Sequence, residues 1–357
     1  MRSVLVDKIA SVALQADLGQ EIRVADDIPC EEGVLIAAEV LNNKSRYNVL
    51  ELTSGRMAQV KRGDVIVGAL GHRNALFGYS GHLPTELAPG DTVQILNMGG
   101  VLGICDSINP SYGEPFDCRV LGVVLDFPYL GQRVGVPARV SDETLDVDAQ
   151  VQFADVPVVA IAGTCMNAGK TAAACAIVSR FRHNGLTVDA FKATGVALRR
   201  DILAMEDAGA RHTGIFTDYG VVATTPKNAP ALTRRLLADL GANRPDVIVF
   251  ELGDGILGAY GVEAILLDER IRDQLTAIVL CANDPVSAWG GVKLLRESYR
   301  LEPTVVTGPA TDNRVGIDII EQRSSVAAIN ALSSGAELSD LLQSHIGLGK
   351  PLEQASL

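Results

Sequence analysis

The sequence predicts an α/β protein in which a smaller, mainly β N-terminal domain precedes a C-terminal parallel sheet with helices on both faces. Three observations predict this. The chain has 357 residues, which is long for one domain at roughly 150 residues per domain. Near residue 150, short β-like runs give way to apolar runs that alternate with helix-length segments, as in a parallel sheet covered by helices. A glycine-containing loop at 163–171 joins the first of these apolar runs to a helical segment.

The composition restricts the partners that this protein is expected to have. Its 31 Lys and Arg against 43 Asp and Glu give a net charge of −12, whereas nucleic acids and anionic membranes attract positive surfaces. Hydrophobic residues make up 47% of the chain and charged residues 21%, which excludes global disorder. Asp7, Lys8 and Asp17 interrupt the N-terminal apolar stretches, so no signal peptide is expected, and the sequence has no run of 18 apolar residues that would predict a membrane span. Six cysteines without a CxxC pair predict reduced thiols and a cytoplasmic location.

The N-terminal domain is predicted to cover residues 1–145. Turn signals such as Ser54-Gly55 and Pro89-Gly90 separate short runs rich in β-branched residues, and this spacing predicts a small antiparallel barrel or sandwich. The strands are expected at 34–36, 47–52, 65–70, 92–96, 101–104 and 121–125.

A glycine-rich loop at 71–82 carries His72, Arg73 and His82. It is either a substrate-binding face on which Arg73 grips a carboxylate, or a polar hairpin tip. A metal site made from the two histidines is not expected, because no third ligand is evident.

The C-terminal domain is predicted to cover residues 152–357, after a polar, acidic linker at 141–152. Strands are expected at 156–162, 186–191, 247–251, 277–281 and 304–307. Helices are expected at 170–183, 201–210, 229–240, 262–274 and 285–298, with further helical packing at 324–332 and 338–344.

The loop at 163–171 predicts a phosphate-binding site and a P-loop NTPase type of domain. It ends in Gly-Lys-Thr at the start of a helix, so that backbone amides, the helix N-terminus and Lys170 all face an anion. The usual GxxxxGK[ST] pattern would place glycine at Thr164, whereas this chain has it one residue earlier. The residues expected to bind the nucleotide here are Gly163, Thr164, Asn167, Ala168, Gly169, Lys170 and Thr171.

Polar side chains at the ends of the following strands predict the rest of the site. Glu251 closes an apolar run, and Mg²⁺ prefers hard oxygen ligands, so Thr171, Asp201 and Glu251 are the expected metal ligands. Asp201 is alternatively an N-cap of the next helix. Lys192 is either a charge-neutralising group or a lysine that extends to solvent.

Two residues further along the chain have open roles. Asn283 is expected either to contact the nucleotide base or to begin the next helix. Asp254 either positions a nucleophile or shapes its turn.

The residues 163–171, 192–195, 198–204 and 247–255 resemble the corresponding motifs of dethiobiotin synthetase and of its relatives that amidate cobyrinic acids. The C-terminal half, over roughly 155–310, is also similar to the two-domain DUF1611 family, some members of which are described as acting on amino acids such as D-glutamate. The resemblance implies an ATP- and Mg²⁺-dependent enzyme in which Lys192 contacts the transferred phosphate and the substrate carboxylate, and a homodimer.

The function expected from these features is phosphoryl transfer from ATP to a small carboxylate or amine, of the ligase or kinase type. Lys170, Lys192 and Glu251 are the expected catalytic residues. Two alternatives stay open: an acyl-CoA-dependent N-acyltransferase, in which the loop holds the CoA pyrophosphate, and a nucleotide-dependent switch or chaperone.

Overall fold

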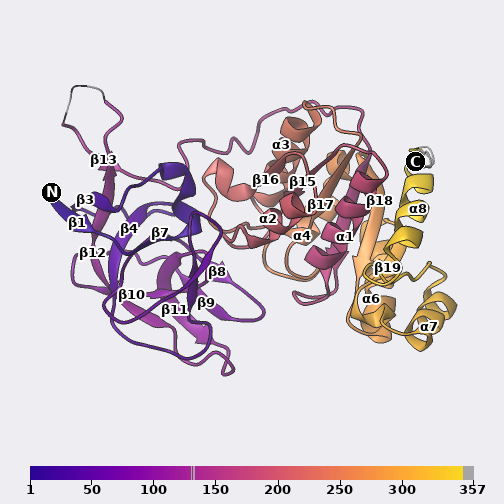
Figure 1. Ribbon diagram of the computed structural model, residues 1–357, viewed down its shortest axis with the longest axis horizontal. Coiled ribbons are helices and arrows are strands. Elements are labelled where there is room, and N and C mark those ends of the chain that lie inside the picture. Colours follow the sequence, from indigo (N-terminus) through magenta and orange to yellow (C-terminus); the bar gives the residue numbers. More distant parts are fainter. Residues whose placement is uncertain (130, 132, 349–357) are drawn as a thin grey trace, which may run out of the picture. The chain divides into compact units, whose positions relative to one another are not determined.

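The computed structural model describes residues 1–129, 131 and 133–348 (Figure 1). The chain forms two compact units that alternate along the sequence. One unit is Met1–Leu145 with Val196–Arg200 and Phe216–Thr224, and the other is Asp146–Gly195, Asp201–Ile215 and Thr225–Leu357. Among the helices of the described residues, none has both the length and the apolar character needed to cross a bilayer.

The first unit is mainly β, as predicted. Its large sheet has 11 strands, with the order β1-β3-β12-β4-β7-β11-β9-β8 along its main path, and most neighbouring strands are antiparallel. The strands of the unit are β1 (Arg2–Leu5), β2 (Lys8–Ile9), β3 (Glu21–Ala25), β4 (Leu35–Val40), β5 (Val49–Glu51), β6 (Met57–Gln59), β7 (Val65–Leu70), β8 (Arg73–Asn74), β9 (Tyr79–His82), β10 (Thr92–Ile95), β11 (Val101–Ile108), β12 (Phe116–Asp126) and β13 (Val136–Pro137). A short 3₁₀ helix, η1 (Ser11–Ala16), follows β2, and β5 and β6 form a separate hairpin.

The long strand β12 organises this sheet. It pairs with β3, β4, β10 and β13, and a register shift between Val120 and Gly122 bends it. Gly122 has a φ of 150°, and a Cβ there would lie 2.5 Å from the carbonyl oxygen of Ala25, so only glycine fits this bend.

All six N-terminal strands that the sequence predicts are present; β7 has the predicted bounds, and the ends of the others are shifted. The prediction at 121–125 covers only part of β12, and the strands that were not predicted are β1, β2, β3, β6, β8, β9 and β13. Strands β1, β6 and β9 have three or four residues each, too few for a period-two signal. Strand β3 does alternate between exposed and buried residues, and the sequence reasoning missed it.

The second unit is a six-stranded, fully parallel sheet in the order β16-β15-β17-β14-β18-β19. Its strands are β14 (Val158–Gly163), β15 (Val188–Lys192), β16 (Thr213–Ile215), β17 (Val247–Glu251), β18 (Leu275–Cys281) and β19 (Val305–Thr307). Its α-helices are α1 (Lys170–His183), α2 (Arg200–Asp207), α3 (Ala229–Gly241), α4 (Val262–Leu267), α5 (Glu269–Arg272), α6 (Pro285–Tyr299), α7 (Arg314–Ser324) and α8 (Gly335–His345).

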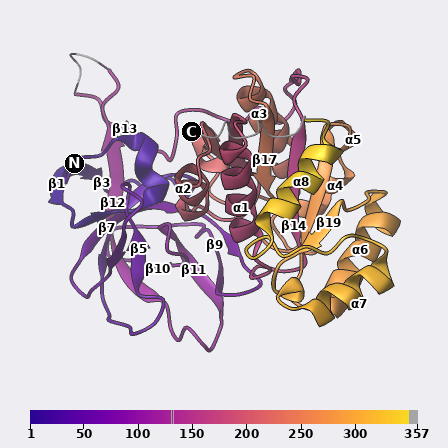
Figure 2. The ribbon, with the colours of Figure 1, turned by 45° about the vertical axis from the view of Figure 1, so that its right-hand side comes forward.

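Helices cover both faces of this sheet, as predicted. Helices α1 and α8 lie over one face of the sheet (Figure 2). They share a buried cluster with that face, which includes Val159, Val249 and Val279. On the opposite face, α3 lies against Gly214 of β16, where a Cβ would meet Leu236, and α6 lies against Leu280. The strands therefore read as continuous apolar runs, because both faces are buried.

Three C-terminal predictions need correction. The helix expected at 262–274 is two helices, α4 and α5, because the chain is extended at Asp268, whose carboxylate caps α5 through the amide of Ile271. The helix expected at 324–332 is not formed: helix α7 ends at Ser324, because Ser325 has a left-handed φ of 54°, and Ala328 forms an isolated bridge with Val306. Strand β16 was not predicted, because its three residues are too few for a periodic signal.

Candidate functional site

The loop between β14 and α1 has the form that a phosphate loop requires. Gly169 has a φ of 88° and precedes the first residue of α1, a conformation that favours glycine. A Cβ at Gly163 would lie 2.8 Å from Cδ and 3.1 Å from Nζ of Lys170. Gly163, which stands one position before the glycine of the usual pattern, therefore leaves room for the Lys170 side chain.

Lys170 is buried within this loop. Its Nζ donates hydrogen bonds to the carbonyl oxygens of Cys165 at 2.9 Å and Met166 at 3.4 Å. Burial lowers the pKa of Lys170, while the neighbouring Glu251 and Asp254 raise it. Because an ammonium group carries three donors, one N–H of Lys170 is left for a ligand.

The amides of the loop are also left unpaired. Within the described part of the chain, the N–H groups of 165–169 donate to no carbonyl or side chain, although Ala168 is fully buried. The Thr164 hydroxyl is likewise buried without a hydrogen-bond partner among these residues. Buried donors without acceptors, such as the Thr164 hydroxyl, are rare in folded proteins. Unpaired amides beside a lysine at a helix N-terminus are the arrangement that binds phosphate.

Strand register brings an acidic cluster beside the loop. Glu251 lies opposite Ile161 of β14 on one side and Lys192 of β15 on the other. The Thr171 hydroxyl donates to Glu251 Oε2 at 2.9 Å, and Lys192 Nζ forms an ion pair with Asp201. Four of the predicted catalytic and metal residues thus meet at the carboxyl end of the sheet, where open α/β sheets bind ligands.

Asp201 does not act as the N-cap of a helix. Helix α2 begins at Arg200, so Asp201 lies in its first turn, and its carboxylate pairs with Lys192 instead. Lys192 is buried rather than extended to solvent.

The charges of the site favour a divalent cation. Burial and the neighbouring Asp201 raise the pKa of Glu251, and Lys192, Lys170 and the Thr171 hydroxyl lower it. Negative groups outnumber positive ones at this site. The carboxylates are those of Asp201, Glu251 and Asp254, and the ammonium groups are those of Lys170 and Lys192. No group of three or more His, Cys, Asp or Glu side chains that could hold a metal occurs in the described ranges. Two carboxylates and one hydroxyl nevertheless fit Mg²⁺, which keeps several waters and takes few protein ligands.

A glycine-rich turn at 252–258 closes this side of the site. A Cβ at Gly253 would lie 2.2 Å from the Thr194 carbonyl oxygen, and one at Gly255 would lie 3.0 Å from the Thr164 carbonyl oxygen. Between them, Asp254 has a left-handed φ of 72°, and neither of its buried carboxylate oxygens receives a hydrogen bond of full geometry from the described residues. Burial raises its pKa, whereas the nearby amides of Gly255 and Ala259 and the charge of Lys170 lower it. The carboxylate oxygens therefore have capacity left for a water or a ligand donor.

Asn283 lies at the crevice between β14 and β18. The connection after β14 leads to β15 and the one after β18 leads to β19, in opposite directions along the sheet, which is where such sheets bind ligands. The exposed Asn283 donates from Nδ2 to Cys165 Sγ at 3.0 Å, while Asp284 caps α6. Asn283 therefore contacts the phosphate loop, and its neighbour begins the helix.

The glycine-rich loop of the first unit does not present Arg73 to a ligand. Arg73 is buried and donates to the carbonyl oxygen of Leu96 and to the Tyr47 hydroxyl. His82 Nδ1 lies 2.8 Å from a carboxylate oxygen of Asp106, and His72 Nδ1 accepts a hydrogen bond from the Leu83 amide at 3.4 Å.

The sequence reasoning missed a polar pocket in the first unit, described below, because its residues come from two segments without a known motif. It also missed Cys281, whose carbonyl oxygen accepts from the Thr164 amide at 2.9 Å and holds the loop to β18.

Comparison with known proteins gives only distant similarity. No family model and no curated protein matches the sequence. Among solved structures, a DUF1611 family protein from Anabaena variabilis superposes with a TM-score of 0.38 and 14% identity over 56% of this chain and 63% of that one, less than two thirds of its length. The signal recognition particle receptor FtsY from Elizabethkingia anophelis gives a TM-score of 0.38 and 14% identity over 54% of this chain and 67% of that one. The GDP complex of the 54 kDa signal recognition particle protein from Aeropyrum pernix gives a TM-score of 0.37 and 19% identity over 55% of this chain and 50% of that one. The P-loop arrangement of the second unit rests on the strand order and contacts of this chain.

Proposed function

We propose that the second unit binds a nucleoside triphosphate with Mg²⁺ and transfers its terminal phosphoryl group to a small carboxylate or amine. One observation carries this proposal: unpaired amides surround the buried Lys170 in a loop whose next residue, Thr171, is hydrogen-bonded to Glu251. ATP is the nucleotide proposed, from the resemblance of the loop motif.

Each residue has a role that follows from its position. The amides of 165–169 hold phosphate oxygens, and the free N–H of Lys170 adds a charge-assisted hydrogen bond to them. Lys192, at the level of Glu251 in the sheet, orients the acceptor and neutralises its negative charge. Asp254 holds a water or the polar end of the substrate. Such positioning and charge stabilisation are what phosphoryl transfer requires.

The residues that would hold Mg²⁺ are Thr171, Asp201 and Glu251. When bound, the ion supplies neutralisation of the phosphate charge. The Thr171 hydroxyl and the Glu251 carboxylate are already oriented by their mutual hydrogen bond, and Asp201 is held by Lys192. A carboxylate acceptor would need no general base, because it is already a nucleophile. A small-molecule substrate, a homodimer and a cytoplasmic location belong to the same proposal.

Isothermal titration calorimetry with the Lys170→Ala variant tests the nucleotide site. Loss of a buried, charge-assisted contact is expected to weaken ATP·Mg²⁺ binding by at least about tenfold. Lys293→Ala is the matched control, because Lys293 is exposed on α6 and pairs with Glu297, and its affinity should equal that of the wild type. Equal affinity in Lys170→Ala and the wild type would refute the site.

The same titration separates the alternatives. ATP·Mg²⁺, GTP·Mg²⁺ and acetyl-CoA are each added to the wild-type protein. Preference for ATP supports the proposal, preference for GTP supports the switch, and binding of acetyl-CoA alone supports the acyltransferase. Turnover is then followed by mass spectrometry of a mixture of small carboxylates and amines, and ATP consumption that depends on one of them identifies the acceptor.

A further inference from the structure

A pocket of about 530 Å³ lies in the first unit between the segments 42–46 and 110–114. Its volume falls within the range of about 300–1,000 Å³ that is usual for small-molecule sites. The segment 42–46 follows β4, and 110–114 connects β11 with β12. Asn42 joins the two segments, because its Nδ2 donates to the Pro115 carbonyl at 3.1 Å and its Oδ1 accepts from the Asp117 amide at 3.0 Å.

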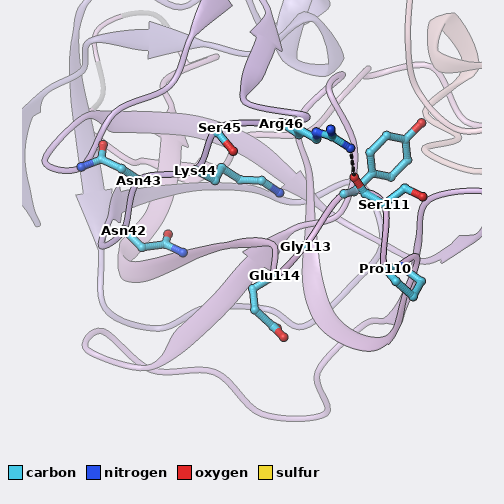
Figure 3. Close-up of a pocket in the computed structure, with 10 residues that line it drawn as sticks. Asn42, Asn43, Lys44, Ser45, Arg46, Pro110, Ser111, Gly113 and Glu114 are labelled. Carbon is cyan, nitrogen blue, oxygen red and sulfur yellow. Dashed lines mark hydrogen bonds between the residues drawn. The ribbon is translucent and has the colours of Figure 1, made fainter.

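Two cations line this pocket, and neither forms an ion pair with Glu114, which also lines it. Lys44 and Arg46 extend from 42–46 toward 110–114, whereas Glu114 points away from them (Figure 3). Arg46 donates one hydrogen bond, to the Ser111 carbonyl oxygen at 3.4 Å, although a guanidinium carries five N–H donors. Among the described residues neither cation forms an ion pair with a carboxylate, although the chain as a whole carries a charge of −12.

The ammonium group of Lys44 is held in a fixed position. Its Nζ donates to the hydroxyl of the fully buried Tyr79, and that hydroxyl donates to the Gly113 carbonyl at 3.0 Å. The same Nζ lies 4.8 Å from the centre of the Tyr79 ring and 5.4 Å from that of Phe116. Since an ammonium group has three donors, two N–H groups of Lys44 are left for a ligand.

An aromatic wall supports this position. Tyr112, which lines the pocket, stacks on Tyr47 with ring centroids 4.7 Å apart. Tyr47 has a left-handed φ of 52°, an uncommon conformation for a bulky residue that persists only where its surroundings hold it. Here they do, because Arg73 donates to the Tyr47 hydroxyl at 3.0 Å. The pocket is therefore preorganised, which reduces the entropy lost on binding.

We propose that this pocket binds a small anion that bears a carboxylate or phosphate group, held between Lys44 and Arg46. The site is separate from the phosphate loop and does not depend on the function proposed above. Hydrogen bonds between ionised groups are the strong ones, and two unpaired cations next to hydroxyls and amides supply them to an oxyanion.

The pH dependence of binding identifies Lys44. Burial lowers its pKa to about 8, while Cys105 and Glu114 raise it. Burial raises the pKa of Tyr79 to about 12, and those of Cys105 and Tyr112 are also raised, so these neighbours stay neutral near pH 8. A bound anion favours the ammonium form and raises the pKa of Lys44. For succinate, whose two carboxylates are both ionised in this range, affinity should therefore be constant just below pH 8 and fall above it, by up to about tenfold per pH unit.

Calorimetric titration of the full-length protein with succinate and with inorganic phosphate tests the proposal. The phosphate titrations use the Lys170→Ala variant, so that the phosphate loop does not contribute. Lys44→Met and Arg46→Gln are each expected to weaken binding by about tenfold or more. Arg23→Gln is the control, because it removes an exposed positive charge on β3 of the same unit.

The outcomes are distinct. Binding of succinate, of phosphate or of both, weakened by the two pocket variants and not by the control, supports the site and identifies the anionic group. Arg46→Gln should keep the fall in affinity above pH 8, and Lys44→Met should abolish it. Since Arg46 is exposed, its variant tests the site even if Lys44→Met fails to fold. The proposal is overturned if neither anion binds, if both pocket variants bind as the wild type does, or if Arg23→Gln weakens binding as much as they do.

Discussion

At the scale of single residues, the space that Lys170 occupies depends on Gly163. The lysine side chain folds back over the first residue of its own loop, and its Cγ and Cδ take the place where a Cβ of residue 163 would lie. A loop with its first glycine one position earlier than usual therefore still has room for the lysine, because the position that must lack a side chain is the one under the lysine.

This contact makes Gly163→Ala a sensitive test. The added methyl would displace Lys170 from its hydrogen bonds to Cys165 and Met166, so nucleotide affinity should fall by roughly tenfold, about 1.4 kcal/mol. The free energy of unfolding should change less, since the end of a lysine side chain can move. Calorimetry and thermal unfolding measure the two effects. Gly19→Ala is the control, because no atom lies within 4 Å of its Cβ position; a Gly163→Ala protein with wild-type affinity would show that Lys170 is not held by this packing.

At the scale of elements, helix α6 packs closely against both the phosphate loop and β18. Two adjacent glycines in this helix have different surroundings. A Cβ at Gly291 would lie 3.0 Å from both Leu280 Cδ2 and Thr164 Cγ2, whereas one at Gly290 would have open space around it. The close approach of helix, strand and loop thus depends on one of the two glycines.

The pair Gly290→Ala and Gly291→Ala tests this packing. Alanine at 290 should raise the free energy of unfolding by about 0.5–1 kcal/mol, because glycine in a helix interior is unfavourable by that amount. Alanine at 291 should lower it and also weaken ATP binding, because Thr164 must move. Chemical denaturation and calorimetry compare the two variants. Equal stabilisation by both substitutions would mean that α6 can move away from Leu280 and Thr164 without lowering the free energy of unfolding.

At the scale of the whole molecule, the chain passes between the two units more than once. Val196–Arg200 and Phe216–Thr224 belong to the first unit, although both follow the phosphate loop in sequence. Within that unit, the Asn97 side chain donates to the Ala197 carbonyl at 2.7 Å, and Glu51 accepts from the Arg199 amide at 2.8 Å. The core of the mainly β unit is therefore completed by residues far beyond its own strands.

The Val222→Ala variant tests whether the core of the first unit depends on the segment Phe216–Thr224. It is fully buried in the core of the first unit, and its Cγ1 would lie 2.8 Å from a Cβ at Gly71. Val222→Ala should cost about 1.5–3 kcal/mol through lost burial and a cavity. Hydrogen–deuterium exchange should then become faster in β7 and β11 of that unit. Val221→Ala, at a partly exposed neighbouring position, should leave these rates unchanged; unaltered exchange in both variants would contradict the shared core.

The sequence alone determined the parallel α/β architecture of the second unit and the place of its phosphate loop. Apolar runs, helix-length segments and a Gly-Lys-Thr at a helix start are local features, and the forces that produce them act over a few residues. It also indicated Glu251, because a carboxylate at the end of a buried strand has few packing explanations.

Only the tertiary structure decided which distant residues meet. Strand register placed Lys192 beside Glu251, and Asp201 became a partner of Lys192 rather than a helix cap. The pocket of Lys44 and Arg46 joins two segments more than sixty residues apart, and two short segments complete the first unit. Such contacts join residues that are far apart in the sequence, so the hydrophobic periodicity of a short stretch of sequence cannot predict them.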